Sequence, residues 1–597
     1  MGEKQQNTKN SVSGKAFDWS ILSKVIHYAR PYKWQTIISL FLSVALGLLA
    51  TARPILIRNG VDYALVKGGD IVSLWYTMII LFSALLLEAI GQFVFIYFTN
   101  DLGARVIKDI RIKLFDHLLD FRIPFFDKTP IGTLVTRTVS DVETMAEIFS
   151  NGILVIFGDL FKIVVMITTM FVLFDSSLVA ISLSVIPLLF IATRWFQQNI
   201  KLVFTDVRNQ VAALNSFVQE RISGMSVVQL FTRERSESKR FREINAKHRD
   251  ANIRGIWYFS LFLPIIDMLS SVSIALAIWF GGLKASMGGD VSVGDLTALI
   301  VFINLLYRPL RQLADRFNTL QMGMVASERV LKLVNDTDEK EISGKHHQNR
   351  VSGDVEIKNL SFAYSKKEWI LEDINVKISS GQTYALVGAT GSGKSTLVHL
   401  LLGYYQVQKG SVSLDGMDLK KWSLNSLRKN VSLVQQDVFL FSDSVRNNVT
   451  VYRDVKDEDI WKAAEDMGIK DFISSLPGGL DYDVKERGGM LSTGQRQLLA
   501  FLRAYLNNPS FLVLDEATSS IDSQAEKWIQ RATKTLTKGR TSIVVAHRLA
   551  TVVNADHIIV LDKGKIVEEG THKSLLKRSG YYQNLFNKQY FDSKDSI

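Results

Sequence analysis

The feature that most constrains this chain is a set of six long apolar stretches, all of them in its first half. Each stretch is close to the ~20 consecutive apolar residues that an α-helix needs to cross a lipid bilayer. The sequence therefore predicts a membrane domain of six spanning helices. The predicted spans are, approximately, residues 34–57, 71–98, 148–174, 178–196, 256–283 and 296–313.

The connections between these spans differ in length and in charge. Residues 99–147 and 197–255 carry eighteen Lys and Arg, whereas the three short connections carry only Arg58, Lys67 and Lys284. Because positively charged connections stay on the cytoplasmic side, we expect a multi-pass protein of the cytoplasmic membrane with both termini in the cytoplasm. Both long connections space their apolar residues as helices do, which predicts helices that continue past the membrane.

The composition indicates two unlike parts joined end to end. Of 597 residues, 47% are hydrophobic and 22% are charged, which is too apolar for a disordered chain and too charged for a wholly membranous one. The net charge is +11, and because eighteen of the 70 Lys and Arg lie in the long connections between spans, the sequence favours a lipid bilayer over a nucleic acid as the partner. The absence of cysteine excludes a disulfide framework, a thiolate zinc site and a cysteine nucleophile.

Shifts in composition predict the domain boundaries. Residues 1–16 are polar and lack the apolar region of a signal peptide, so we expect a disordered cytoplasmic N-terminus followed by a membrane domain at 17–334. Residues 335–350 form a polar linker without a periodic pattern. From residue 351 to 585, short runs rich in Val, Ile and Leu alternate with helical stretches, which predicts an α/β domain whose sheet is largely parallel. Residues 586–597 form a polar tail.

The α/β domain carries the segment Gly-Ala-Thr-Gly-Ser-Gly-Lys-Ser between a strand-like run and a helical one. In that context this spacing forms a phosphate-binding loop. Its glycines let backbone N–H groups close around the β- and γ-phosphates, Lys394 supplies a point charge, and Ser395 can ligate Mg²⁺. ATP and Mg²⁺ are therefore the predicted cofactors. The predicted ATP-binding residues here are Gly388, Ala389, Thr390, Gly391, Ser392, Gly393, Lys394, Ser395 and Thr396.

A second site segment is the apolar run 511–514, which is followed by Asp515 and Glu516. Open α/β sheets bind their ligands at the carboxyl ends of the strands, where these two carboxylates are expected. Asp515 would hold Mg²⁺, and Glu516 would take the proton of the attacking water. An apolar strand ending in Asp-Glu is also typical of a surface turn, but its place downstream of a phosphate-binding loop favours catalysis.

A third segment, Leu491-Ser492-Thr493-Gly494-Gln495, precedes a helical stretch that runs through Leu506. It resembles the signature sequence of ATP-binding cassette (ABC) proteins. The resemblance extends from about residue 17 to 585 and is to half-size ABC exporters. It implies a six-helix transmembrane domain with long cytoplasmic extensions, followed by an α/β P-loop nucleotide-binding domain.

The resemblance also implies roles for single residues. Tyr364 matches the aromatic residue that stacks on adenine, Gln436 the glutamine that reaches Mg²⁺, and His547 the histidine at the γ-phosphate. Asp522 matches the loop that crosses to the partner domain. A core tyrosine and a surface glutamine remain alternative interpretations of the first two. The expected catalytic residues are Glu516, His547, Gln436 and Lys394, and the expected Mg²⁺ ligands are Ser395, Gln436 and Asp515.

In the family, the signature of one domain serves the phosphate loop of the opposite domain, so the resemblance implies a dimer. Ser492 and Gly494 would offer donors to the γ-phosphate at the start of their helix. Thr493 departs from the family, which has glycine there, and its β-branched side chain crowds the approach to phosphate. We favour a heterodimer whose site opposite Thr493 is slow, with a homodimer as the alternative.

Three acidic residues, Glu88, Asp159 and Asp267, lie inside the predicted spans. Ionisable groups are costly in a bilayer and are therefore candidates for function. One hypothesis is that all three line an inward-open cavity that takes amphipathic, including cationic, substrates. The alternative is structural: Asp159 pairs with Lys162 one helical turn away, and the other two bond to neighbouring helices.

Together these features predict ATP-driven export, or inner-to-outer leaflet translocation, of an amphipathic small molecule, drug, lipid or peptide by alternating access. Segments 125–127 and 220–224 of the long connections resemble the parts of exporters that contact the nucleotide-binding domains. The alternative is an ATP-gated channel or a membrane regulator with the same parts. The presence of both Glu516 and His547 favours a pump over a channel or regulator, because a catalytic base together with a switch histidine implies repeated ATP hydrolysis.

Overall fold

The computed structural model describes residues 19–65, 71–288, 291–365, 368–515, 523–545 and 552–590. They form two compact units. The first, the membrane domain, comprises the described residues of Met1–Leu119 and Pro130–Thr337. The second, the nucleotide-binding domain, comprises those of Asp120–Thr129 and Asp338–Ile597.

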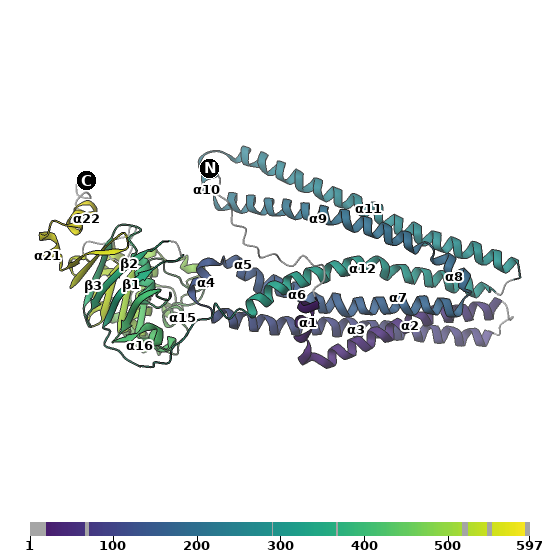
Figure 1. Cartoon of the computed structure of the whole chain (residues 1–597), viewed down its shortest axis with the longest axis horizontal. Helices are drawn as coiled ribbons and strands as arrows, with labels where there is room; N and C mark the ends of the chain where they lie inside the picture. The colour runs from purple at the N-terminus through teal and green to yellow at the C-terminus, as the bar shows by residue number, and fades with distance from the viewer. Residues whose placement is uncertain are drawn as a thin grey trace. The chain divides into compact units, whose positions relative to one another are not determined.

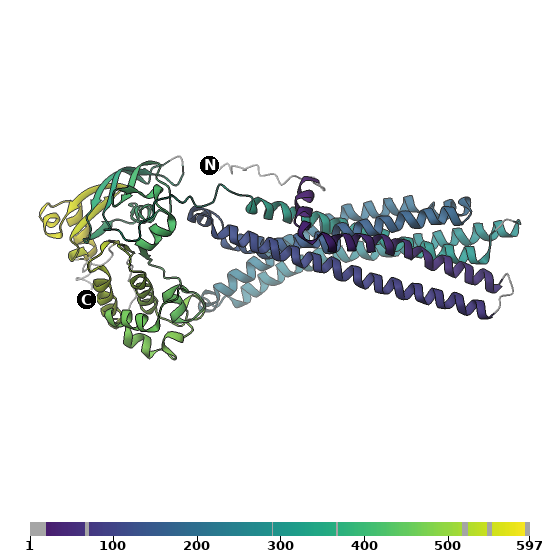
Figure 2. The same ribbon diagram turned by 90° about the horizontal axis from the view of Figure 1, so that it is seen from below.

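The membrane domain is entirely helical in its described part, and Figures 1 and 2 show its long helices running alongside one another. Its main helices are α1 (Trp19–His27), α2 (Lys33–Leu65), α3 (Ile71–Leu119), α7 (Ile153–Leu173), α8 (Ser176–Leu183), α9 (Ile186–Ser223), α11 (Glu234–Ser286) and α12 (Val293–Val334). Its short helical segments are η1 (Arg30–Tyr32), α5 (Ile131–Thr136), η2 (Arg137–Asp141), α6 (Val142–Glu147), η3 (Ile148–Gly152) and α10 (Met225–Leu230).

Six helical segments among the described residues are long and apolar enough to cross a membrane, as the sequence predicted. Several are much longer than a bilayer requires. The 53 residues of α11 would extend ~80 Å at 1.5 Å per residue, against a hydrocarbon core of ~30 Å. In Figure 1 the paired helices α9 and α11 continue to the short helix α10 that joins them. The predicted fold class, with helices that continue past the membrane, is confirmed.

Polar contacts fix the helix ends at the short connections. Asp175 caps α8 by accepting hydrogen bonds from the backbone N–H groups of Ser177 and Leu178. Ser292 caps α12 in a reciprocal capping box with Asp295. Asp62 near the end of α2 accepts hydrogen bonds from the Ser292 hydroxyl (2.8 Å) and from the first turn of α12. Asp62 thereby satisfies an N–H group at the start of α12 that has no partner inside its own helix. Because Asp62 belongs to α2, this contact also holds the ends of the two helices together.

The nucleotide-binding domain contains two sheets. The six-stranded sheet has the order β10-β9-β3-β8-β7-β6 and is parallel except for β10, whereas the four-stranded sheet, in the order β2-β1-β4-β5, is antiparallel. The parallel sheet was predicted and the antiparallel one was not. The strands are β1 (Val355–Phe362), β2 (Leu371–Ile378), β3 (Thr383–Gly388), β4 (Lys409–Leu414), β5 (Met417–Asp418), β6 (Val431–Val434), β7 (Phe511–Asp515), β8 (Thr541–Val545), β9 (His557–Asp562) and β10 (Lys565–Gly570).

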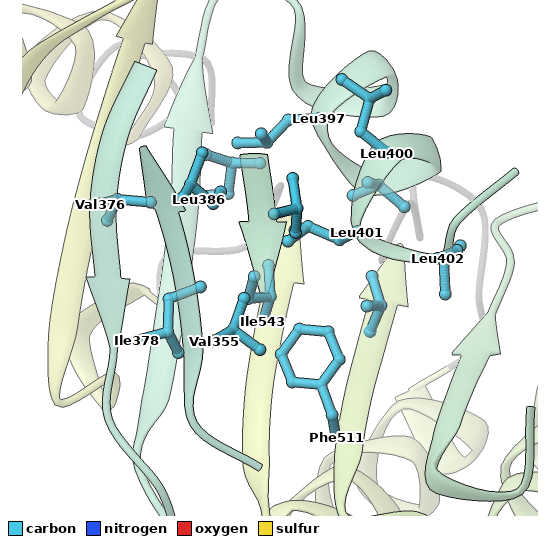
Figure 3. Close-up of a cluster of buried hydrophobic side chains, with 14 of the residues drawn as sticks. Val355, Val376, Ile378, Leu386, Leu397, Leu400, Leu401, Leu402, Phe511 and Ile543 are labelled. Carbon is cyan, nitrogen blue, oxygen red and sulfur yellow. The ribbon is translucent and has the colours of Figure 1, made fainter. Parts of the chain in front are cut away.

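Two hydrophobic cores lie on opposite faces of the six-stranded sheet. Side chains of a strand alternate between faces, and in β7 Val513 belongs to one core while Leu512 and Leu514 belong to the other. The first core includes α13 (Lys394–Leu401), and Figure 3 shows Leu397 and Leu401 of this helix near the strand residues of that core. The second core includes α18 (Thr493–Asn507). The helices α13 and α18 therefore cover opposite faces.

The described residues of this domain form several further helices. They are α4 (Ile123–Lys128), η4 (Leu419–Lys421), α14 (Leu424–Asn430), α15 (Val445–Thr450), α16 (Asp457–Asp466), α17 (Lys470–Ser475), η5 (Gly479–Asp481), η6 (Glu486–Gly488), α19 (Ser523–Thr537), α21 (His572–Lys577) and α22 (Tyr581–Tyr590).

The segment 338–350, which the sequence placed in a polar linker, is packed on the nucleotide-binding domain. Its Gly344 N–H donates a hydrogen bond of 2.8 Å to the Trp422 carbonyl oxygen. The ring of His346 meets the Trp422 ring edge to face, with centroids 4.7 Å apart. Trp422 itself is 1% exposed, so this segment shields a core side chain. A polar composition gave no sign of this packing, because the contact is made by backbone groups and one ring.

Candidate nucleotide-binding site

The glycine-rich loop joins β3, which ends at Gly388, to α13. Gly391 and Gly393 have φ angles of +83° and +104°, which favour glycine. A Cβ atom on Gly393 would lie 2.7 Å from Leu371 Cδ2, and one on Gly388 would lie 2.2 Å from the Leu561 carbonyl oxygen. The close packing therefore requires glycine at these positions. The unpaired N–H groups of the first turn of α13 can bind an anion.

The charge and polarity of the loop suit phosphate. Lys394 Nζ donates hydrogen bonds to the carbonyl oxygens of Gly388 (2.7 Å) and Ala389 (3.0 Å). Burial lowers the pKa of Lys394, and the negative charge of Asp515 opposes that shift. Ser392 Oγ is buried and has no hydrogen-bond partner among the described residues. Phosphate oxygens would satisfy both the desolvated ammonium and the buried hydroxyl, so these residues fit the triphosphate of ATP.

Three oxygen-bearing side chains follow strands of the same sheet. Asp515 ends β7, Gln436 lies two residues beyond β6, and Ser395 lies on the first turn of the helix after β3. The strands occur in the order β3-β8-β7-β6 and are parallel, so their carboxyl ends share one edge. Carboxylate, amide and hydroxyl oxygens are ligands that Mg²⁺ accepts beside phosphate. The residues present therefore fit a magnesium ion at this edge.

Tyr364 lies just after β1, and its side chain faces the helix of the phosphate loop. Its hydroxyl donates a hydrogen bond of 3.2 Å to Thr396 Oγ1. Its ring meets Phe362 and Tyr405 edge to face, with centroids 5.0 and 5.1 Å apart. The residue is 45% exposed, unlike a core tyrosine. An exposed ring above the loop can stack on a flat base.

The signature segment begins α18. The Ser492 hydroxyl accepts a hydrogen bond from the Gln495 N–H, and Gln495 Oε1 accepts one of 2.8 Å from the Ser492 N–H. Leu491 and Gly494 are buried, while Ser492 and Thr493 are exposed. Thr493 takes the first helical position, and its hydroxyl accepts a hydrogen bond of 3.2 Å from Arg496. The helix therefore tolerates the β-branched side chain, which stands at its exposed N-terminus.

Comparisons with known proteins agree with this geometry. Residues 36–310 match the family model described as the ABC transporter transmembrane region, and residues 371–519 match the one described as ABC transporter. An uncharacterized ABC transporter ATP-binding protein of Bacillus subtilis, YknV, is 33% identical over 98% of this chain and 97% of its own. The chain belongs to the ABC transporter family.

Two further relatives have names that indicate cargo. A Bacillus subtilis protein named provisionally as a multidrug export ATP-binding/permease protein, YgaD, is 34% identical over 95% of this chain and 99% of its own. An ATP-dependent lipid A-core flippase of Syntrophus aciditrophicus is 33% identical over 96% of this chain and 95% of its own. This ABC transporter joins one membrane domain to one ATPase domain, as half-size exporters do, and couples ATP hydrolysis to transport.

Three predicted residues of the transporter, Glu516, Asp522 and His547, lie outside the described residues. The strands that precede two of them are neighbours. β7 ends at Asp515, immediately before Glu516, and pairs in parallel with β8, with Asp515 opposite Val545. Their roles in the transporter therefore remain predictions from the sequence.

In the membrane domain, each of the three acidic residues is paired with an arginine of another helix. Glu88 Oε2 lies 2.7 Å from Arg53, and Asp159 Oδ2 lies 2.8 Å from Arg316. Asp267 pairs with an arginine of α12. The Asp159–Lys162 pair of the structural alternative does not form; Asp159 of α7 pairs instead with Arg316 of α12, whose guanidinium reaches the carboxylate. A basic residue in an apolar span is an equally strong signal, and Arg53, in the predicted span 34–57, could have been found in this way.

α4 (Ile123–Lys128) covers the first segment that resembles an exporter contact region, whereas residues 220–223 of the second segment end α9 and Gly224 leads directly into α10 (Met225–Leu230). α4 belongs to the nucleotide-binding domain, where Tyr405 donates a hydrogen bond of 2.5 Å to Asp127. Burial and this hydrogen bond raise the pKa of Tyr405. A cavity of about 430 Å³ lies beside α4, and its lining includes Pro124 and Tyr364. Sequence reasoning did not identify Tyr405, because its role depends on a contact far along the chain.

Proposed function

We propose that this transporter works as a dimer in which two ATP molecules bind between two nucleotide-binding domains. The observation that carries this proposal is the placement of α13 and α18 on opposite faces of one sheet. The phosphate loop and the signature therefore begin helices on different faces of that sheet. A second cassette can present its own signature to the loop at Gly388–Ser395, which supports the composite site.

Within each site, the residues have distinct tasks. The N–H groups of the loop and Lys394 hold the β- and γ-phosphates. Ser395, Asp515 and Gln436 would hold Mg²⁺, which draws electron density from the phosphate oxygens when it is bound. Glu516 accepts a proton from the attacking water. His547 donates a hydrogen bond to the γ-phosphate as negative charge develops there.

ATP binding then closes the two domains and turns the membrane cavity from inward-facing to outward-facing, and hydrolysis resets it. The cargo is an amphipathic molecule such as a drug, a lipid or a peptide. The names of the relatives, a multidrug export protein and a lipid A-core flippase, support this class without selecting a member. The excess of Lys and Arg in the long connections supports a cytoplasmic location for both termini and the nucleotide-binding domain.

The dimer partner is, in this proposal, a different half-transporter. Thr493 stands where the family has glycine, and Arg496 holds its hydroxyl at the exposed helix start. A γ-phosphate approaching from the partner would meet a β-branched side chain there instead of bare backbone. The site formed by Thr493 and the partner's phosphate loop is therefore slow, while the site that contains Glu516 turns over.

Replacing Glu516 tests the assignment of the catalytic base. Glu516→Gln keeps the shape of the side chain but removes its basicity, so ATP binding should persist while hydrolysis falls roughly 10²- to 10⁴-fold. The measurements are nucleotide binding and ATP turnover by the dimer purified in nanodiscs. Glu569→Gln, at an exposed position of β10, is the matched control and should leave turnover unchanged. Near-normal turnover of Glu516→Gln would contradict the assignment.

Reconstituted vesicles distinguish the pump from the gated channel. A pump accumulates an amphiphile against its gradient when ATP is supplied on the side of the nucleotide-binding domains. A channel passes it only down the gradient. Glu516→Gln abolishes uphill accumulation if transport is driven by hydrolysis at that site.

A further inference from the structure

Charged side chains from four helices gather inside the membrane domain. α2, α3, α7 and α12 pack against one another there. Arg53 of α2 pairs with Glu88 of α3, and Arg316 of α12 pairs with Asp159 of α7. Lys162 lies one turn beyond Asp159 on α7, within Coulomb range of Asp159, Glu88 and Arg53. The two ion pairs and Lys162 therefore belong to one cluster.

Arg308 of α12 completes this basic cluster, since it interacts electrostatically with both Asp159 and Lys162. The cluster then holds four cations, Arg53, Lys162, Arg308 and Arg316, beside the carboxylates of Glu88 and Asp159. Each carboxylate already has an arginine partner. Lys162 and Arg308 form no hydrogen bond or ion pair with any side chain that the structure describes. The described side chains thus leave two positive charges unbalanced.

Three members of the cluster lie deep enough to be in the hydrocarbon region. Counted from the helix ends at the short connections, Lys162, Arg308 and Glu88 are ~17, ~23 and ~26 Å inward at 1.5 Å per residue. The hydrocarbon core of a bilayer is ~30 Å thick. Unbalanced cations at this depth are costly, which makes Lys162 and Arg308 candidates for binding an anion.

We infer that the basic cluster binds the anionic headgroup, in particular a phosphate, of the transported amphiphile. A phosphate ester carries one to two negative charges, which match the two unbalanced cations, and Arg and Lys are the side chains that bind phosphate best. The apolar tail stays among the apolar side chains of the spans. This inference rests on the proposed export function and names its substrate class. The three carboxylates alone suggested a cationic substrate, whereas this inference gives an anionic one.

Two amphiphiles with the same tail and opposite headgroup charge test whether the cluster binds an anion or a cation. Dodecyl phosphate and dodecyltrimethylammonium are titrated onto the dimer purified through a tag on this chain, in zwitterionic nanodiscs without ATP, and bound probe is measured by equilibrium dialysis. Dodecyl phosphate should bind at least tenfold more tightly. Inorganic phosphate, tested alongside, should bind weakly because it lacks a tail. Tight binding of inorganic phosphate would instead assign the cluster to a free anion and overturn the lipid-like substrate.

Variants locate the binding site. Lys162→Met and Arg308→Met each keep a long side chain but remove one charge, and each should weaken dodecyl phosphate binding about tenfold, as expected for a hydrogen bond to a charged group. Lys162→Glu should shift the preference toward dodecyltrimethylammonium. Arg194→Met is the matched control, because Arg194 is an exposed cation on α9 outside the cluster. It should leave dodecyl phosphate binding unchanged.

The outcomes separate this inference from the function on which it rests. Equal binding of the two amphiphiles, or equal loss in Arg194→Met and Lys162→Met, would overturn the inference even if ATP-driven transport is intact. Selective dodecyl phosphate binding that depends on Lys162 and Arg308 would support it even if uphill transport failed. Basal ATP hydrolysis by each variant shows that the protein is folded. Arg308 is exposed, so the change Arg308→Met removes no buried contact on which folding depends.

Discussion

His399 shows how the environment of one residue sets its chemistry at the base of the nucleotide site. It lies on α13, one turn beyond the phosphate loop, with its ring stacked near Tyr405 at a centroid distance of 6.1 Å. Its Nδ1 atom is buried without a hydrogen-bond partner among the described residues. Burial lowers the pKa of His399, and the charges of Asp127 and Asp515 offset the shift only in part. The folded domain therefore favours the neutral imidazole.

This lowered pKa predicts a loss of stability in mild acid. As the pH falls below the unfolded value of about 6.5, the unfolded chain takes up a proton that the folded domain resists, so unfolding becomes easier. Above that pH the imidazole is neutral in both states, and the penalty disappears. His399→Gln should reduce the drop in Tm between about pH 7.5 and pH 5.5. Thermal unfolding of the full chain, followed by tryptophan fluorescence, measures this.

The control for this experiment is His347→Gln, because His347 is exposed in the segment before β1. It should retain the wild-type dependence of Tm on pH. If His399→Gln also retained that dependence, the buried imidazole would not be its source.

The element with the most consequential position is α4. It lies between two predicted spans in the sequence but packs within the nucleotide-binding domain. Phe121 and Phe125 meet edge to face at its start, with centroids 4.7 Å apart, and Arg122 pairs with Glu339 at 2.8 Å. The hydrogen bond from Tyr405 to Asp127 fixes its other end. Because Tyr405 also contacts Tyr364, α4 is joined to the side chain that stacks on adenine in the proposed site.

Tyr405→Phe tests whether this bond carries coupling. Losing a hydrogen bond to a charged group costs about 1.5–3 kcal/mol of interaction, while the aromatic packing is kept. Basal ATP hydrolysis should therefore persist, and the stimulation of hydrolysis by lipids of the native membrane should fall several-fold. The measurement is the ratio of stimulated to basal turnover.

Tyr452→Phe is the matched control for this change. It removes a tyrosine hydroxyl bond to a carboxylate, Asp443, elsewhere in the same domain. It should preserve the stimulation ratio. An equal fall in both variants would mean that the effect is general to the domain and would contradict a special role of α4.

At the scale of the whole molecule, the proposed dimer needs two chains to complete each ATP site. The phosphate loop begins a helix on one face and the signature begins a helix on the other. In the proposed dimer, a single nucleotide-binding domain offers two half-sites. With a different partner, one composite site contains Glu516 of this chain and the other contains Thr493.

The variant Thr493→Gly tests whether Thr493 slows the second ATP site. Removing the β-branched side chain gives the partner's γ-phosphate access to the helix start, so ATP turnover by the purified heterodimer should rise by up to about twofold, as a second site becomes competent. Thr493→Ser, which keeps the hydroxyl, should raise it less. Turnover that does not change in Thr493→Gly would contradict a slow site. So would a fully active, cooperative homodimer obtained from this chain expressed alone.

Much of this architecture is encoded locally. Six apolar stretches were sufficient to predict six spans, because the bilayer imposes length and hydrophobicity on each helix separately. The phosphate loop was predictable because Gly391 and Gly393 need a backbone region that few other residues accept. The strand before Asp515 was predictable because a strand buried on both faces is a continuous apolar run. Each of these signals lies within one short segment of chain.

The remaining features depend on which distant segments meet. The sequence alone determined the spans, the nucleotide-binding domain and the segments of its site. Only the tertiary structure decided that Asp159 pairs with Arg316 rather than Lys162, and that α4 joins the nucleotide-binding domain. It also decided that α13 and α18 cover opposite faces of a sheet. The physical reason is that periodicity and backbone preference act within a segment, whereas ion pairs and packing require two segments to be brought together by the fold.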